Sequence, residues 1–519
     1  MSQTATKEFG KWRSIFWPVH SFELKKILPM FLLFFFINFN YTILRDTKDT
    51  LIVTAPGSGA EAIPFLKVWG VLPFAILFMI VYSKLSNVMN KQKLFMSTIA
   101  FFGAFFALFA LLLYPYKDAL HPIAFCDSMQ AILPAGFKGL IAVLRNWTYS
   151  IFYIMSELWG SVAISLLFWG FANDITRVSE SKRFYALFGL GANIAMYPSG
   201  LLIKLFASMR SSFAPGVDAW GMCLNYTLAA VVVACAATMA IYWWINKEVL
   251  TDPRFYDASE VKKAKKEKPN MSMKESLLFL AKSPYILCLA TLVMAYGISI
   301  NLVEVTWKSQ LKLQYPNPND YQNFMGTFSM LTGTATIFMM LFVGGNVLRR
   351  YGWGPAALFT PVVLLLTGIG FFGFVIFRDQ MAGMIAALGT TPLMLAVIFG
   401  TIQNFMSKST KYSLFDPTKE MAYIPLDQES KVKGKAAIDV VAARAGKSGG
   451  SIIQQILLVG STGVITDVAP IIACFLFVVI GVWILAARNL AARFAALTAQ
   501  RDAEKAAPAA QPAMATVQR

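Results

Sequence analysis

The chain has 519 residues, of which 57% are hydrophobic and only 14% charged, and its formal net charge is +18. Soluble domains usually carry about 25% charged residues, so this composition excludes a typical soluble protein and predicts an all-α polytopic membrane protein. The five cysteines are scattered, and the two histidines are too few for a histidine metal site or a catalytic triad. We therefore expect no metal, no cofactor, no catalytic residue and no nucleic-acid partner.

Long apolar runs divide the chain into about twelve candidate membrane helices. They begin near residues 27, 64, 95, 149, 184, 222, 277, 325, 354, 386, 448 and 469. A polar segment, residues 246–276, contains the basic string KKAKKEK and separates the first six helices from the last six. Two six-helix halves joined by a basic loop are typical of major-facilitator-type transporters, so we predict a major-facilitator-like fold.

The predicted organisation has five parts. They are a cytoplasmic N-terminal segment (1–26), an N-terminal six-helix half (27–245), a basic cytoplasmic linker (246–276), a C-terminal six-helix half (277–489) and a cytoplasmic tail (490–519). Within the second half, the polar stretch 407–446 predicts a long cytoplasmic loop. Basic residues follow the second, fourth and eighth apolar runs, whereas the intervening short loops carry few. By the positive-inside rule, both termini are expected in the cytoplasm.

The first apolar run ends in NYTILRDTKDTL, which contains Arg45, Asp46, Lys48 and Asp49. Each charge inside a membrane span costs roughly 2.5–3.5 kcal/mol and therefore marks a candidate functional site. On a helix Arg45 and Lys48 share a face, because they are three residues apart. Two interpretations stay open. The cluster is either a helix end that meets water, or a positive patch lining a cavity, with the aspartates orienting the cations.

Three further charges lie in apolar runs. Lys67, in IPFLKVWG, either reaches the membrane surface or serves the site. Glu157 lies well inside its run, with Tyr153 one turn earlier, and is expected to carry a proton or to pair with a cation. Glu304 follows Asn301 late in the seventh run. Because the first and seventh runs open the two halves and both carry polar groups late, a central site between the halves is predicted.

The string GKSGGS, at 446–451, ends like a phosphate-binding P-loop, but that motif requires a glycine where this chain has Val441. A nucleotide-hydrolysing fold is therefore excluded. Lys447 instead enters the eleventh helix beside Gly446, Gly449 and Gly450, which permit close helix packing or close approach of a ligand. Several interior cations suit a polyanionic substrate, and aromatic faces suit a base or sugar, so phosphorylated metabolites, including nucleotides, are the predicted substrate class.

Six strings together resemble the ATP/ADP translocase family of plastids and obligate intracellular bacteria. They are NYTILRDTKDTL, EAIPFLKVWG, SELWGSVAISLLFWGFAND, FYALFGLGAN, FDPTKEMAYIPLD, and KVKGKAAIDVV followed by GKSGG. The similarity runs from about residue 20 to 490, and the lack of a plastid transit segment makes the chain most similar to chlamydial members. The resemblance implies exchange of host ATP for bacterial ADP plus phosphate without hydrolysis. It also implies that transport requires four membrane charges, which fall on Lys67, Glu157, Glu304 and Lys447.

We therefore expect a non-enzymatic antiporter that works by alternating access as a monomer in the bilayer of the bacterial inner membrane, with ATP, ADP and phosphate as substrates. The expected phosphate-binding residues are Arg45, Lys48, Lys67 and Lys447, the charge-balancing or gating residues are Asp46, Asp49, Glu157 and Glu304, and the candidate base or sugar contacts are Tyr153 and Asn301. The alternative function is a proton-coupled importer of nucleotides or other phosphorylated metabolites, with Glu157 as the proton carrier.

Overall fold

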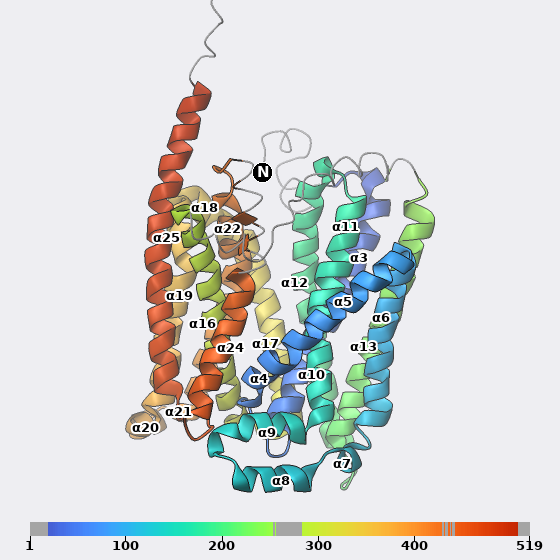
Figure 1. Ribbon diagram of the computed structural model, residues 1–519, viewed down its shortest axis with the longest axis vertical. Coiled ribbons are helices and arrows are strands. Elements are labelled where there is room, and N and C mark those ends of the chain that lie inside the picture. The colour runs from blue at the N-terminus through green and yellow to red at the C-terminus, as the bar shows by residue number, and fades with distance from the viewer. Residues whose placement is uncertain are drawn as a thin grey trace, which may run out of the picture.

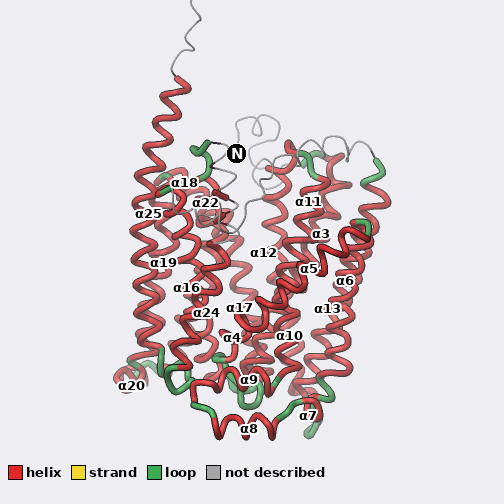
Figure 2. Tube along the Cα trace, viewed as in Figure 1, coloured by secondary structure: helices red, strands yellow, loops and turns green. Residues whose placement is uncertain are grey.

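The computed structural model describes residues 19–252, 255, 283–427, 430, 434–435, 437–438 and 442–506. All regular secondary structure in these residues is helical (Figure 2). Most of the predicted linker 246–276 lies outside the described residues, as does part of the stretch 407–446.

The first half contains six membrane-length helical segments. They are α3 (Leu24–Thr54), α4–η2–α5 (Ala62–Phe65, Leu66–Val71, Leu72–Val88), α6–η3 (Lys91–Leu108, Phe109–Leu113), α10–η5–α11 (Trp147–Trp159, Gly160–Phe168, Trp169–Ile175), α12 (Val178–Ser208) and α13–η7 (Ala219–Trp244, Ile245–Val249). The short elements α7 (Lys117–Leu120), α8 (Ile123–Ile132), η4 (Ala135–Phe137) and α9 (Lys138–Arg145) connect the third segment to the fourth.

The second half repeats this plan. Its segments are α16 (Pro284–Gln314), α17–η9–α18 (Pro318–Phe338, Met339–Gly344, Gly345–Tyr351), α19 (Trp353–Ile376), α21–η10–α22 (Pro392–Thr410, Lys411–Phe415, Asp416–Ala422), α24 (Ala443–Val459) and α25 (Ala469–Ala506). A short helix, α20 (Arg378–Ala386), precedes α21.

Ten helices in the described residues are long and apolar enough to cross a membrane. The two segments of the predicted twelve that fall outside this set are α21 and α24. Both carry polar side chains into the interior, such as Asn404 of α21 and Gln454 of α24, which are fully buried. These helices therefore line the inside of the bundle, where polar residues find protein partners instead of lipid.

Two predicted boundaries differ from the structure. The stretch 407–446, expected as a loop, begins as helix, because α21, η10 and α22 continue without a break to Ala422. Two of its charges, Lys411 and Asp416, form an ion pair at 2.6 Å within this continuous helical segment. The expected tail, 490–519, also begins as helix, since α25 continues to Ala506 through an alanine-rich stretch of high helix propensity.

The two halves lie side by side, with the first half coloured blue to green and the second yellow-green to red (Figure 1). Helices α3 and α12 end at the same end of the molecule, where α8 and α9 lie (Figure 1). We call this end the Thr54 end, after the last residue of α3, and the opposite end the Leu24 end. The contacts between the halves are made mainly by α12 with α17, and α3 contacts both α17 and α16.

Glycines permit close helix contacts within and between the halves. A Cβ atom on Gly200 of α12 would lie 2.4 Å from the carbonyl oxygen of Gly326 of α17. Within the second half, α16 and α24 also approach closely. A Cβ on Gly446 would lie 2.8 Å from the carbonyl oxygen of Met294, and one on Gly450 would lie 2.9 Å from the Cβ of Asn301. Of the two expectations for these glycines, the structure shows close helix packing at Gly446 and Gly450, whereas a Cβ on Gly449 would lie 3.8 Å from Ile298, an ordinary contact.

The substitution Gly200→Ala is expected to destabilise the protein, because its methyl group would push against the backbone of α17. Overpacking of this kind costs about 1–3 kcal/mol. The matched control is Gly189→Ala on the same helix, where a Cβ meets nothing within 4 Å. Thermal unfolding of the purified variants should show a lower melting temperature for the first and an unchanged or higher one for the second. Equal melting temperatures would contradict the close contact.

Candidate functional site

The charged cluster of α3 lies inside the molecule and does not mark a helix end. The helix continues beyond it to Thr54, and Arg45, Asp46, Lys48 and Asp49 are all buried, with at most 9% of any residue exposed. Of the two interpretations that the sequence left open, the helix end meeting water is therefore wrong. Because buried charges must be paired, each of these four residues finds partners on other helices or beside it.

Arg45 and Asp46 bind each other and also the second half. The Arg45 Nε donates to Asp46 Oδ1 at 2.9 Å, and its Nη2 donates to the hydroxyl of Ser329 on α17 at 2.6 Å. The Ser329 hydroxyl in turn donates to the other carboxylate oxygen of Asp46. This closed triangle fixes the guanidinium and ties α3 to α17.

Lys48 is held by residues from α3 and α10. Its ammonium lies 2.9 Å from Asp49 Oδ1 and 3.0 Å from Glu157 Oε1. It also lies 3.9 Å from the centre of the Tyr153 ring, within the range of a cation–π interaction. Both α10 residues therefore contact the same cation. Of the two expectations for Glu157, this geometry favours pairing with a cation.

Lys308 of α16 was not found from the sequence, although it connects the two halves. Its ammonium lies 2.7 Å from Asp49 Oδ2 and 3.1 Å from Glu304 Oε1, and the residue is 1% exposed. The four-residue spacing between Glu304 and Lys308 was the available signal, because it places both side chains on one helix face. The position of Asp49 across the interface could not be predicted from that spacing.

Lys67 lies in the π-helical turn Leu66–Val71, and its amine points to the second half instead of reaching the membrane surface. It donates to Asn301 Oδ1 at 2.5 Å and lies 3.9 Å from Glu304 Oε2. Single π-helical turns often occur at functional sites, because the wider turn redirects side chains. The ionic contacts now form an unbroken series, which we call the charge chain. In order it consists of Glu157, Lys48, Asp49, Lys308, Glu304 and Lys67.

The structure does not bring Lys447 into the charge chain. Its backbone nitrogen lies against Gly297 of α16, while its side chain is exposed and has no ion pair among the described residues. Helical spacing places it on the same face as Ser451 and Gln454, which are fully buried. That face of α24 is thus covered by protein towards the Thr54 end and uncovered at Lys447.

The two residues proposed to contact a base or sugar have other contacts in this structure. Tyr153 is completely buried and its ring faces the Lys48 ammonium. Asn301 accepts a hydrogen bond from Lys67 and donates one to the carbonyl of Gly297 at 2.9 Å. Both residues therefore position the cations, and a direct contact to substrate would require these bonds to change.

Further bonds between the halves gather at the Thr54 end. Lys312 of α16 donates to the carbonyl of Ser58, and Gln455 of α24 binds both the Pro64 carbonyl at 2.8 Å and the Trp69 indole at 3.0 Å. Together with the charge chain, these contacts hold the halves against each other at that end.

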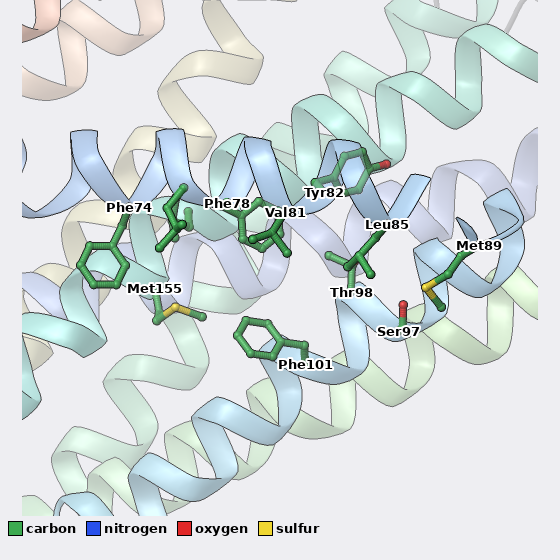
Figure 3. A pocket seen from close by; sticks show the side chains of 12 residues that line it. Phe74, Phe78, Val81, Tyr82, Leu85, Met89, Ser97, Thr98, Phe101 and Met155 are labelled. Carbon is green, nitrogen blue, oxygen red and sulfur yellow. The ribbon is translucent and has the colours of Figure 1, made fainter. Parts of the chain in front are cut away.

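An apolar cavity of about 510 Å³ lies apart from these charges, between α5, α6 and α10 (Figure 3). Phe74, Phe78, Val81 and Phe101 are among its lining residues, and α5 itself has no buried residue. The cavity therefore opens on the apolar surface of the first half and offers no charged group to a polar substrate. Among the described residues, no group of three or more His, Cys, Asp or Glu side chains could hold a metal ion.

The fold resembles that of known transporters. A bacterial homologue of the iron transporter ferroportin superposes with a TM-score of 0.55 at 11% sequence identity, covering 90% of this chain and 100% of that one. Two six-helix halves with buried charges between them define a membrane protein of the major-facilitator fold.

Sequence comparison identifies the family. The model of the TLC ATP/ADP transporter family matches residues 2–494. The chain is 62% identical to ADP,ATP carrier protein 1 of Chlamydia trachomatis over 512 residues, covering 98% of this chain and 96% of that protein. It is 53% identical to the chloroplastic ADP,ATP carrier protein 1 of Arabidopsis thaliana, covering 93% of this chain and 76% of that protein. The chain therefore belongs to the TLC ATP/ADP transporter family.

The substitution Lys308→Met is expected to destabilise the protein by about 3 kcal/mol, because it removes the cation closest to the carboxylates of Asp49 and Glu304. Adding Asp49→Asn to the same variant should restore part of that stability. The control is Lys91→Met, which removes a mostly exposed lysine from its pair with Asp174 and should cost about 1 kcal/mol or less. Thermal unfolding measures all three. A double variant less stable than the single one would argue against the ion pair.

Proposed function

We propose that the protein exchanges ATP for ADP across a membrane by alternating access, without hydrolysis. The single observation that carries the proposal is the charge chain, which collects cations between the two halves of a transporter. Lysine and arginine complement phosphate oxygens, and the relatives named above are called ADP,ATP carriers. In this mechanism Arg45, Lys48, Lys67 and Lys447 bind substrate phosphates.

In this mechanism, the carboxylates pair with the basic side chains of the site when no substrate is bound. When no substrate is present, Glu157 forms an ion pair with Lys48, and Glu304 forms one with Lys67. Asp46 and Asp49 hold Arg45 and the lysines in position. An arriving phosphate competes with a carboxylate for the same ammonium group. Because the Lys67–Glu304 contact joins the two halves, its loss to a phosphate weakens the closed Thr54 end. Substrate binding thereby favours the opposite conformation through its differential affinity for the two states.

Obligate exchange follows from the same competition. Without substrate the cations return to the carboxylates across the interface, and the empty carrier stays closed at one end. Only a loaded carrier then moves its site to the other side. ATP carries one more phosphoryl group than ADP, so inorganic phosphate bound together with ADP would present the same set of phosphates. We therefore include phosphate as a substrate that accompanies ADP.

The protein is proposed to work as a monomer in the inner membrane of a bacterium, with both termini in the cytoplasm. Exposed lysines support this orientation, because Lys84 and Lys93 lie near the Leu24 end of α5 and α6. The Thr54 end then faces away from the cytoplasm, and the charge chain closes the site on that outer side.

Purified protein in liposomes tests the exchange. Labelled ATP should enter vesicles loaded with ADP and should be nearly excluded from vesicles without internal nucleotide. Lys67→Gln should lower the exchange rate by about 10-fold or more, because the lost group binds a charged phosphate. The exposed lysine variant Lys84→Gln should transport normally.

A proton-coupled importer would behave differently in the same vesicles. It would take up ATP into empty vesicles when a pH gradient is the only driving force. Uptake of that kind, with no dependence on internal ADP, would overturn the exchange mechanism. Adding inorganic phosphate inside ADP-loaded vesicles tests the co-substrate, since labelled phosphate should leave only while external ATP enters.

A further inference from the structure

Helix α21 occupies the fourth position in the second half, as the segment that begins with α10 does in the first. Helix α10 contributes Glu157 to the charge chain. On α21 the corresponding polar face carries Asn404, Ser407 and Lys408. The first two are fully buried, so this face of α21 points into the bundle. None of the residues expected at the site from the sequence lies on α21.

Lys408 lies close to the paired charges and is not paired itself. Its ammonium lies 4.9 Å from the centre of the Phe328 ring, one residue before the Ser329 that binds Arg45. Within the described part of the chain, no carboxylate lies within 4.0 Å of Lys408, although the side chain is half-buried.

The neighbouring acids are already occupied. Asp46 binds Arg45, and Asp49 binds both Lys48 and Lys308. Glu157 and Glu304, the remaining two, also have lysine partners. The central charges therefore contain one more cation than they have carboxylates to balance, and the unbalanced cation is Lys408.

An unpaired ammonium group on the inward face of a membrane helix is costly, and a bound anion would offset that cost. A lysine with a purely structural role would instead be expected beside a carboxylate. The Phe328 ring compensates part of the charge, but a cation–π contact of this kind supplies only about 0.5–2 kcal/mol.

We propose that Lys408 forms a phosphate subsite on α21 that receives a phosphoryl group of the substrate. The inference rests on the proposed exchange of ATP for ADP and adds a residue that neither the sequence nor the family comparison assigned. A phosphate reaches Lys408 without displacing a carboxylate, whereas at Lys48 or Lys67 it must compete with Glu157 or Glu304. Lys408 therefore contributes mainly to substrate affinity, while the paired lysines couple binding to the movement of the halves.

Kinetics of Lys408→Gln separate these contributions. We expect its KM for ATP to rise about 10–100-fold, as for loss of a charged hydrogen-bond partner, while kcat changes about twofold or less. The KM for ADP should rise less, since ADP has fewer phosphates to bind. Lys408→Arg should restore most of the affinity. Lys84→Gln, an exposed lysine on α5, is the matched control.

Ligand-induced stabilisation gives a readout that does not require transport. Saturating ATP, and separately inorganic phosphate, should raise the melting temperature of the wild-type protein and of Lys408→Arg more than that of Lys408→Gln. Lys408→Met, which keeps the apolar stem over Phe328, serves if the glutamine variant does not fold. Unchanged KM together with unchanged stabilisation by ATP would overturn the subsite. A fall in kcat at constant KM would also overturn it, because that result assigns Lys408 to the conformational change.

The same experiments distinguish failure of the proposed exchange function from failure of the proposed Lys408 subsite. If the wild-type protein does not exchange ATP for ADP, but ATP or phosphate still stabilises it through Lys408, the exchange mechanism is wrong and the subsite stands. If exchange is normal and Lys408→Gln has wild-type affinity, only the subsite is wrong.

Discussion

The structure depends on how buried basic side chains are paired between the two halves of the molecule. Each buried cation requires a carboxylate, a polar side chain or an aromatic face in place of water. Lys48 alone uses Asp49, Glu157 and the Tyr153 ring. Because the required partners lie on different helices, the pairing fixes the positions of α3, α10 and α16 relative to one another. The helix packing and the site are thus set by the same contacts.

The sequence was sufficient to predict the fold class and several residues of the charge chain. Apolar runs predicted the helices, and the cost of burying charge by itself pointed to Lys67, Glu157 and Glu304. The sequence was insufficient where a polar stretch is compatible with two different structures. The polar stretch that contains Lys408 looked like a loop, because an interior helix face and a solvated loop have similar composition. Only the packing of α21 distinguishes them.

The ion-pair partners on other helices could not be predicted from the sequence, for a different reason. Spacing on one helix predicts neighbours such as Glu304 and Lys308, but it contains no information about the register between helices. The contact of Lys308 with Asp49 joins residues that are far apart in the chain and belong to different halves. Lys447 shows the same limit. Its glycine-rich motif indicated that another helix or a ligand could approach closely, but it identified neither α16 as the packing partner nor a partner for the Lys447 side chain.

In the proposed mechanism, the unpaired cation binds the substrate before the paired cations release their carboxylates. A substrate that met only paired lysines would have to break ion pairs before it gained any contact, and its binding would be slow and weak. A substrate that met only unpaired lysines would bind without disturbing the halves, and nothing would link binding to movement. In the proposed mechanism, the unpaired Lys408 binds a substrate phosphate first. The substrate then competes with Glu304 for Lys67, whose contact with Glu304 keeps the Thr54 end closed. Exchange without hydrolysis needs no more than this competition.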